Sequence, residues 1–379
     1  MALSILLRVC QSLSASPELT KPRLVTVGFS HFCEKARWAM DLSPSEYVEE
    51  IHAPAVHLSA TLQLASLPRV GTWTEHGFFG TLLAQRHDVK TNRRKETTGV
   101  PKLVLPEKLL FQKLVYTYVD KQKSIKSSAE NASAGSGIVV VASGSSGILK
   151  LLSDVHSLQL GHLYPKGTTG QRVVELEHFL DTELASAATN WAFGNILLSG
   201  KGFHPAMPDA SNSAVVDCLV DSFYQQRIPL VEKVIWNVFG RLFLIPLMIK
   251  ANSVSSESRE KARDDIHRIF SYMDSLLEEH NPTGSVSQGF LLGTDKITAA
   301  DISFASFCAP IVLPPEANDF FVSYEALMRL AKRGEVSSPN PGAYEVIKLA
   351  DEVRGTYRSA QYALDLYKTH RSRDRVPST

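Results

Sequence analysis

The segment from Leu24 to Leu42 constrains the fold of this chain more than any other. An apolar, β-rich run, LVTVGF, gives way to SHFC and then to EKARWAMDL, whose apolar residues recur at helical spacing. This pattern predicts a strand, a tight turn and a helix, with the hydroxyl of Ser30 and the thiol of Cys33 at the turn. Backbone N–H groups at a helix start are unpaired and carry partial positive charge, so the turn favours an anion.

Two interpretations of this turn are open from the residues alone. A nucleophile or an activated thiol would gain most from standing at the start of the helix. Alternatively, Ser30 is only the N-cap of the helix and Cys33 is a small buried residue. We favour an inward-facing Cys33.

Composition narrows the class of protein. The 379 residues are 44% hydrophobic and 21% charged, which is typical of a folded protein with about two domains. Forty basic and thirty-nine acidic residues give a net charge of +1, which argues against an electrostatic nucleic-acid binder. The four cysteines are widely spaced and include no CxxC pair, so neither a disulfide scaffold nor a metal site is expected.

Targeting signals are weak. Residues 1–22 form an N-terminal extension with few acidic residues, which resembles an organelle transit peptide only loosely. The expected compartment is the cytoplasm, with a chloroplast or mitochondrion as the alternative. The longest other apolar stretch, Val234–Ile249, is interrupted by polar residues and is shorter than the ~20 residues that span a bilayer, so no membrane span is expected.

The pattern of apolar residues divides the chain near residue 160. Strands are predicted at Leu24–Phe29, Lys102–Leu105 and Ile138–Ala142, with helices at Glu34–Leu42 and Gly147–Leu152. The second half is predicted to be helical at Gln171–Leu198, Ser213–Lys250 with a break at Pro229, Ser256–Glu279, Ala299–Ile311, Tyr324–Lys332 and Ala343–Thr369. These patterns predict an α/β domain at 23–158, with irregular insertions at about 67–98 and 109–137, and an all-α domain at 168–370.

Two further motifs lie in the first half. Pro101 directly precedes the strand at Lys102, where a proline costs no ladder hydrogen bond, and a cis bond there would turn the Val100 backbone toward a ligand. A trans proline that closes a loop is the structural alternative. The run ASGSSG before the helix LKLLSD places Ser145 and Ser146 where hydroxyl and N–H groups can hold a carboxylate, although ordinary capping would give the same pattern.

A capping box is predicted in the second half. In the run KITAADI, Thr298 and Asp301 have the spacing at which each side chain bonds the other's backbone N–H. Ile297 and Ile302 occupy the positions of a hydrophobic staple. We therefore interpret Asp301 as a structural residue with no part in catalysis.

In this order, the four motifs resemble those of the glutathione S-transferase superfamily, and the resemblance covers most of the chain. SHFCEKARWAMDL resembles the first strand-helix turn of the family, GVPKLVL its cis-proline turn, and GSSGILKLLSD its serine-bearing turn. FLLGTDKITAADISFASFCAPIVLPPE resembles the helical domain with its capping box and is the most specific single match. The resemblance implies a thioredoxin-like glutathione-binding domain followed by a helical domain, with glutathione as co-substrate, no metal and a homodimer.

The resemblance also implies roles for individual residues. Ser30 matches the residue that contacts the glutathione sulfur, and Val100 and Pro101 match the cis-proline turn that pairs with the cysteinyl backbone. Ser145, with Ser146 beside it, matches the residue that binds the γ-glutamyl carboxylate. The pocket for a hydrophobic electrophile is expected to be lined by the aromatic side chains of Phe32, Trp191, Phe193 and Trp236. Phe32 is also expected to contact glutathione.

Three hypotheses about function follow. The leading one is a glutathione transferase that activates the glutathione thiol for attack on an electrophile or a peroxide, as in detoxification. The second is a catalytically silent relative used for binding or assembly, which is favoured by Gly144, where the family usually has an acidic residue, and by the two insertions. The third is a thiol oxidoreductase, in which an exposed Cys33 of the Ser30-x-x-Cys33 motif is the catalytic group.

Overall fold

The computed structural model describes residues 21–54, 56–57, 61, 69–74, 77–80, 100–105, 139–198, 228–239, 244–332 and 341–371. The N-terminal extension apart from its last two residues, the insertion at 109–137 and the predicted helical stretch 213–227 lie outside these residues. Among the described residues, all strands precede residue 144 and all elements after residue 156 are helical, in agreement with the predicted order of an α/β part followed by an all-α part.

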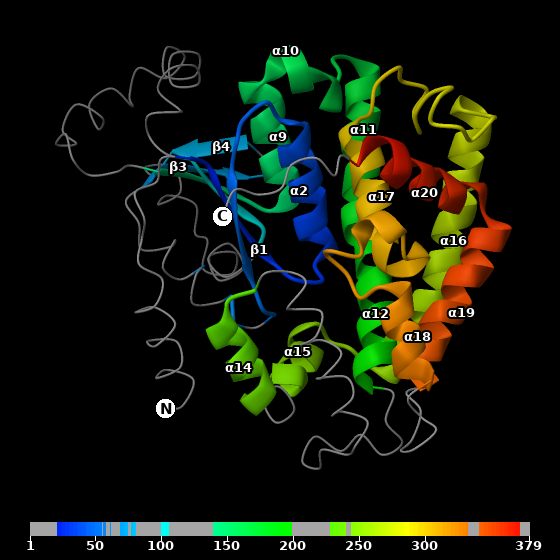
Figure 1. Cartoon of the computed structure of the whole chain (residues 1–379). Coiled ribbons are helices and arrows are strands. Elements are labelled where there is room, and N and C mark those ends of the chain that lie inside the picture. The colour runs from blue at the N-terminus through cyan, green and yellow to red at the C-terminus, as the bar shows by residue number, and fades with distance from the viewer. Residues whose placement is uncertain are drawn as a thin grey trace.

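A mixed sheet of six strands forms one side of the molecule (Figure 1). The strands are β1 (Arg23–Val27), β2 (Val48–His52), β3 (Arg69–Thr74), β4 (Gly77–Gly80), β5 (Lys102–Leu105) and β6 (Val139–Ser143), in the spatial order β2-β1-β5-β6-β3-β4. β1 and β2 are parallel, and β5 runs antiparallel to both β1 and β6.

The expectation of an irregular insertion at about 67–98 is wrong at its start. β3 and β4 lie there, pair as antiparallel neighbours two residues apart, and add to the sheet beside β6. The edge of β6 would otherwise present unpaired backbone groups, which a neighbouring strand satisfies. The remainder of this insertion lies outside the described residues.

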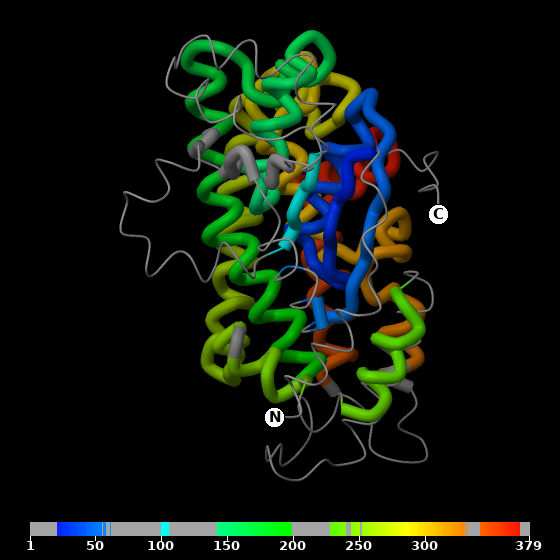
Figure 2. Tube along the Cα trace, turned by 90° about the vertical axis from the view of Figure 1, so that its left-hand side faces the viewer, coloured from blue at the N-terminus to red at the C-terminus, as the bar shows by residue number. Residues whose placement is uncertain are grey.

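Helices pack against the sheet and make up most of the rest of the described chain (Figures 1 and 2). They are α2 (His31–Leu42), α9 (Ser145–Val155), α10 (Ser157–Leu160), η1 (Gly161–Leu163), α11 (Thr168–Phe179), the π-helical turn η2 (Leu180–Leu184), α12 (Ala185–Leu198), α14 (Leu230–Phe239), α15 (Ile245–Ala251), α16 (Ser256–His280), α17 (Ala299–Val312), η4 (Pro315–Ala317), α18 (Tyr324–Lys332), α19 (Pro341–Thr356) and α20 (Arg358–His370).

One hydrophobic core joins the two parts of the chain. α2 lies between the sheet and α17 (Figure 1). The larger cluster of buried side chains runs from Leu24 in β1 through Trp38 in α2 to Phe307 in α17 and Leu366 in α20. The turn between β1 and α2 is therefore packed against the helical part of the molecule.

A second apolar cluster anchors α14 and α15 beneath the end of β2. Trp236 of α14 is fully buried, and its indole N–H donates to the carbonyl of Pro54 at 3.0 Å. Glu232 of the same helix accepts from the backbone N–H of Ala53 at 2.7 Å and pairs with His52 at 2.6 Å. These bonds fix α14 to the sheet.

Candidate functional site

Ser30 ends the turn between β1 and α2 and is the N-cap of α2, which is one of the two interpretations that the sequence left open. Its Oγ accepts the backbone N–H of Cys33 at 3.3 Å, and its side chain is only partly buried. The capping bond uses the oxygen as acceptor, so the hydroxyl proton can still be donated. The residue before it, Phe29, has a left-handed backbone with φ of 65°.

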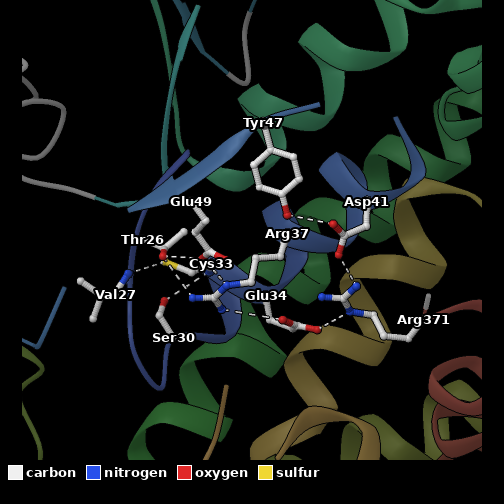
Figure 3. A network of polar contacts seen from close by, with 10 residues as sticks. All are labelled: Thr26, Val27, Ser30, Cys33, Glu34, Arg37, Asp41, Tyr47, Glu49 and Arg371. Carbon is white, nitrogen blue, oxygen red and sulfur yellow. Dashed lines mark hydrogen bonds and ion pairs between the residues drawn. The ribbon is translucent and has the colours of Figure 1, made fainter. Parts of the chain in front are cut away.

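Cys33 is fully buried, which confirms the inward orientation (Figure 3). Its Sγ accepts the backbone N–H of Val27 at 3.4 Å. Burial raises the pKa of the thiol, and this outweighs the opposing effects of Arg37 and Ser30. The exposed thiol that an oxidoreductase role requires is therefore not present at Cys33.

The Val100–Pro101 peptide bond is cis and lies beside the Ser30 turn. β5 pairs with β1 so that Lys102 lies opposite Val25, and continuing this register by two residues brings Val100 level with Val27. The carbonyl of Pro101 accepts the backbone N–H of Gly144 at 3.0 Å. The three turns that the sequence singles out in the first half thus lie at one end of the sheet.

The third of these turns begins α9. Gly144 is the N-cap with φ of 78°, a conformation that favours glycine over the acidic residue expected there, and it supplies no side-chain cap. The first N–H groups of α9, at Ser145 and Ser146, have no acceptor within the helix. Ser145 is 4% exposed. The start of α9 therefore offers backbone donors at the edge of the site.

Ser146 belongs to a buried charge cluster rather than to an open surface. Its Oγ donates to Asp181 at 2.5 Å and accepts from Nζ of Lys35 at 2.8 Å. Lys35 is fully buried and also pairs with Glu177 at 2.8 Å and Asp181 at 2.7 Å. This cluster joins α2, α9, α11 and the π-helical turn η2.

The electrostatics of the cluster follow from two carboxylates sharing one ammonium. Burial opposes the charge of Lys35, but Glu177 and Asp181 outweigh it and raise its pKa. Burial also works against Glu177, yet Lys35 lowers its pKa, whereas burial and the neighbouring Glu177 raise the pKa of Asp181. This cluster was not predicted from the sequence, although the charged run EKAR inside an otherwise buried helix is a signal for it.

A second buried network surrounds the Ser30 turn (Figure 3). Nε of Arg37 donates to Glu49 of β2 at 2.5 Å, and Nη2 of Arg37 donates to Thr26 of β1 at 3.1 Å. Arg371, which follows α20, donates to Glu34 of α2 at 2.8 Å and also pairs with Asp41 of the same helix. The network therefore ties the end of the helical part to the helix that carries the turn.

An apolar cavity of about 50 Å³ lies behind the turn, against the helical part. Its walls include Phe29 from the turn, Phe193 of α12, Leu313 and Val322. Of the predicted pocket aromatics, only Phe193 lines this cavity. Trp191 and Trp236 are buried in the two cores, and the ring of Phe32 packs edge-on against Phe307 of α17 at 5.0 Å.

The capping box of α17 is confirmed. Asp301 is fully buried and accepts from the backbone N–H and hydroxyl of Thr298, at 2.7 and 2.6 Å, from the N–H of Leu291 at 3.0 Å and from the hydroxyl of Tyr362 at 2.8 Å. Burial raises its pKa despite these donors. Its contacts are those of a structural residue.

Two properties of the described residues bear on the kind of site. They contain no group of three or more His, Cys, Asp or Glu side chains arranged to hold a metal ion. No helix among them is long and apolar enough to cross a membrane.

Comparisons with known proteins give limited information. No protein-family model and no curated protein matches this chain. Among solved structures, this chain is similar to a glutathione S-transferase of Ceriporiopsis subvermispora in complex with glutathione. The alignment covers 95% of this chain and 100% of the transferase chain, at 11% sequence identity and a TM-score of 0.38. A TM-score of 0.38 is too low for this likeness to define the fold or the function of the chain.

Proposed function

We propose that this protein is a glutathione transferase-like enzyme that activates the thiol of glutathione at the Ser30 turn. The observation that carries the proposal is the meeting of three turns at one end of the sheet, namely Ser30, cis Val100–Pro101 and the start of α9 at Ser145. The β1-α2-β2 and β5-β6-α9 order, with β5 antiparallel to its neighbours, further supports a thioredoxin-like glutathione-binding domain.

Each turn supplies one contact in this proposal. The N–H groups at the start of α9, with Ser145, bind the γ-glutamyl carboxylate, because a helix N-terminus attracts an anion. The Val100 backbone pairs with the cysteinyl part of glutathione. The hydroxyl of Ser30 donates to the glutathione sulfur and, with the start of α2, stabilises the thiolate of a group whose ordinary pKa is about 8.5.

The electrophile would enter from the helical side. The described lining of the cavity behind Phe29 is apolar, so it favours an uncharged group. Its volume of about 50 Å³ accommodates only a small part of a molecule, so a larger electrophile requires side chains such as Phe321 to move aside.

A catalytically silent binding protein is the competing proposal. It is favoured by Gly144, which has no carboxylate to receive the amino group of glutathione, and by Ser146, whose hydroxyl is occupied by Asp181. The oxidoreductase hypothesis loses support because Cys33 is buried with a raised thiol pKa.

Calorimetric titration with glutathione separates these proposals. Heat of binding that weakens in Ser145→Ala supports a ligand at the start of α9. No heat at millimolar glutathione, which corresponds to a binding free energy weaker than about −4 kcal/mol, rejects the enzyme and favours the silent relative.

Activity assays on two variants then identify the chemical group. Loss of activity in Ser30→Ala with activity retained in Cys33→Ser is the expected result. The reverse pattern would support Cys33 as the catalytic group.

A homodimer and a cytoplasmic location are further proposals. An open cavity of about 490 Å³ between α11 and α16 is lined by the exposed ring of Tyr272 together with Arg172 and Arg268, and a self-complementary contact would cover it. Light scattering of the purified chain measures the oligomeric state.

A further inference from the structure

The ring of Phe320 lies beside two arginines that come from opposite parts of the chain. The guanidinium of Arg37 in α2 is 4.5 Å from the centroid of the Phe320 ring, and the guanidinium of Arg371 after α20 is 5.4 Å from it. Both arginines are almost fully buried, so their attraction to the ring is weakly screened by water. Their other bonds, to Glu49 and Glu34, fix both guanidinium groups beside the ring.

The backbone of Phe320 holds the residue that precedes Ser30. The N–H of Phe29 donates to the carbonyl of Phe320 at 3.1 Å. Phe29 has φ of 65°, a left-handed conformation that a bulky side chain adopts only when its surroundings impose it. Gly28, the residue before Phe29, donates its backbone N–H to the carbonyl of His52 at 3.0 Å, directly after the last β1–β2 pair.

We propose that Phe320 is a positioning residue, clamped by Arg37 and Arg371, that holds Phe29 in its left-handed conformation and thereby aims the hydroxyl of Ser30. The same clamp sets the wall of the apolar cavity, because Phe321 and Val322 follow directly in the chain. The clamp itself is independent of the ligand, whereas its effect on catalysis rests on the proposed function.

Hydrogen exchange of two adjacent amides tests the clamp without any ligand. The substitution Phe320→Leu keeps an apolar side chain and the backbone carbonyl but removes the face of the ring. We expect the Phe29 amide to exchange about tenfold faster relative to the Gly28 amide, measured residue by residue by NMR. An unchanged ratio between the two amides would overturn the proposal.

Two further variants make the test decisive. Phe270→Leu is the matched control, because it shortens a fully buried aromatic residue of α16 away from the turn. In this control, global destabilisation should accelerate the exchange of both amides and leave the ratio of their exchange rates unchanged. Arg371→Lys keeps a charge beside Glu34 but loses the planar guanidinium. It should therefore also raise the exchange rate of the Phe29 amide relative to that of the Gly28 amide. If Phe320→Leu does not fold, this variant tests the proposal in its place.

Kinetics then tests the effect on Ser30. If the parent protein conjugates glutathione, Phe320→Leu should lower kcat and leave the KM for glutathione within about twofold, because Ser145 and α9 still bind the γ-glutamyl end. A raised KM with unchanged kcat would refute the aiming of Ser30. If the parent protein does not bind glutathione, only the proposed function is rejected. The role of Phe320 in holding Phe29 is tested separately, by the ratio of the exchange rates of the Phe29 and Gly28 amides.

Discussion

Replacement of Lys35 by methionine should destabilise the protein strongly. The fully buried ammonium makes three bonds, to Glu177, Asp181 and the hydroxyl of Ser146, and all of them lie at 2.7 to 2.8 Å. Methionine fills a similar volume but leaves two carboxylates in the interior without a cation. Removal of one partner from a buried ionic cluster typically costs about 3–5 kcal/mol.

Urea unfolding followed by circular dichroism measures this loss at pH 8 and at pH 5. The loss should be smaller at pH 5, because the unpaired carboxylates of the variant then bind protons more readily. The triple variant Lys35→Met, Glu177→Gln, Asp181→Asn removes every charge and should recover most of the stability. A loss below about 1 kcal/mol in Lys35→Met, or no recovery in the triple variant, would refute the assignment of a charge-balanced buried cluster.

Two further predictions concern other buried groups. Asp301→Ala should reduce the free energy of unfolding by about 3–5 kcal/mol, because four hydrogen-bond donors lose their acceptor. Asp265 is more exposed, so Asp265→Ala should cost less than about 1 kcal/mol in the same denaturation assay. Burial opposes the charge of His52, but Glu232 and Glu50 outweigh this effect and raise the pKa of His52 to about 9. The resulting stabilisation of about 3 kcal/mol should be complete below pH 6.5 and should be lost as the pH rises through about 9. The free energy of unfolding, measured over a series of pH values, should therefore depend less on pH in Glu232→Gln, and an unchanged dependence would contradict this prediction.

Local signals predicted most of the elements that carry the candidate site. The strand at Lys102–Leu105 and the helix at Tyr324–Lys332 have the predicted bounds. The helix predicted at Glu34–Leu42 begins three residues earlier, because Ser30 caps it and the helix starts directly after the cap. The capping box of α17 was also predictable, since its two partners are three residues apart.

Contacts between distant parts of the chain were not predictable from periodicity. β2 has no clear alternation of polar and apolar residues, and its place beside β1 depends on pairing between strands. The continuous helix predicted at Ala343–Thr369 is two helices that meet at Tyr357. The partners of Lys35 and Arg371 are 111 or more residues away in the sequence, and they meet these side chains only in the folded protein.

The pairing of Arg371 with Glu34 also has a consequence for synthesis of the chain. Glu34 precedes its partner by 337 residues, so at about 5–20 residues per second it waits roughly 20–70 s on the ribosome before Arg371 exists. During that time the carboxylate of Glu34 has only Arg37 of the same helix as a nearby cation, and the apolar face of α2 stays uncovered until α17 has been made. We therefore expect the nascent first half to be a substrate for chaperones until translation has passed α20.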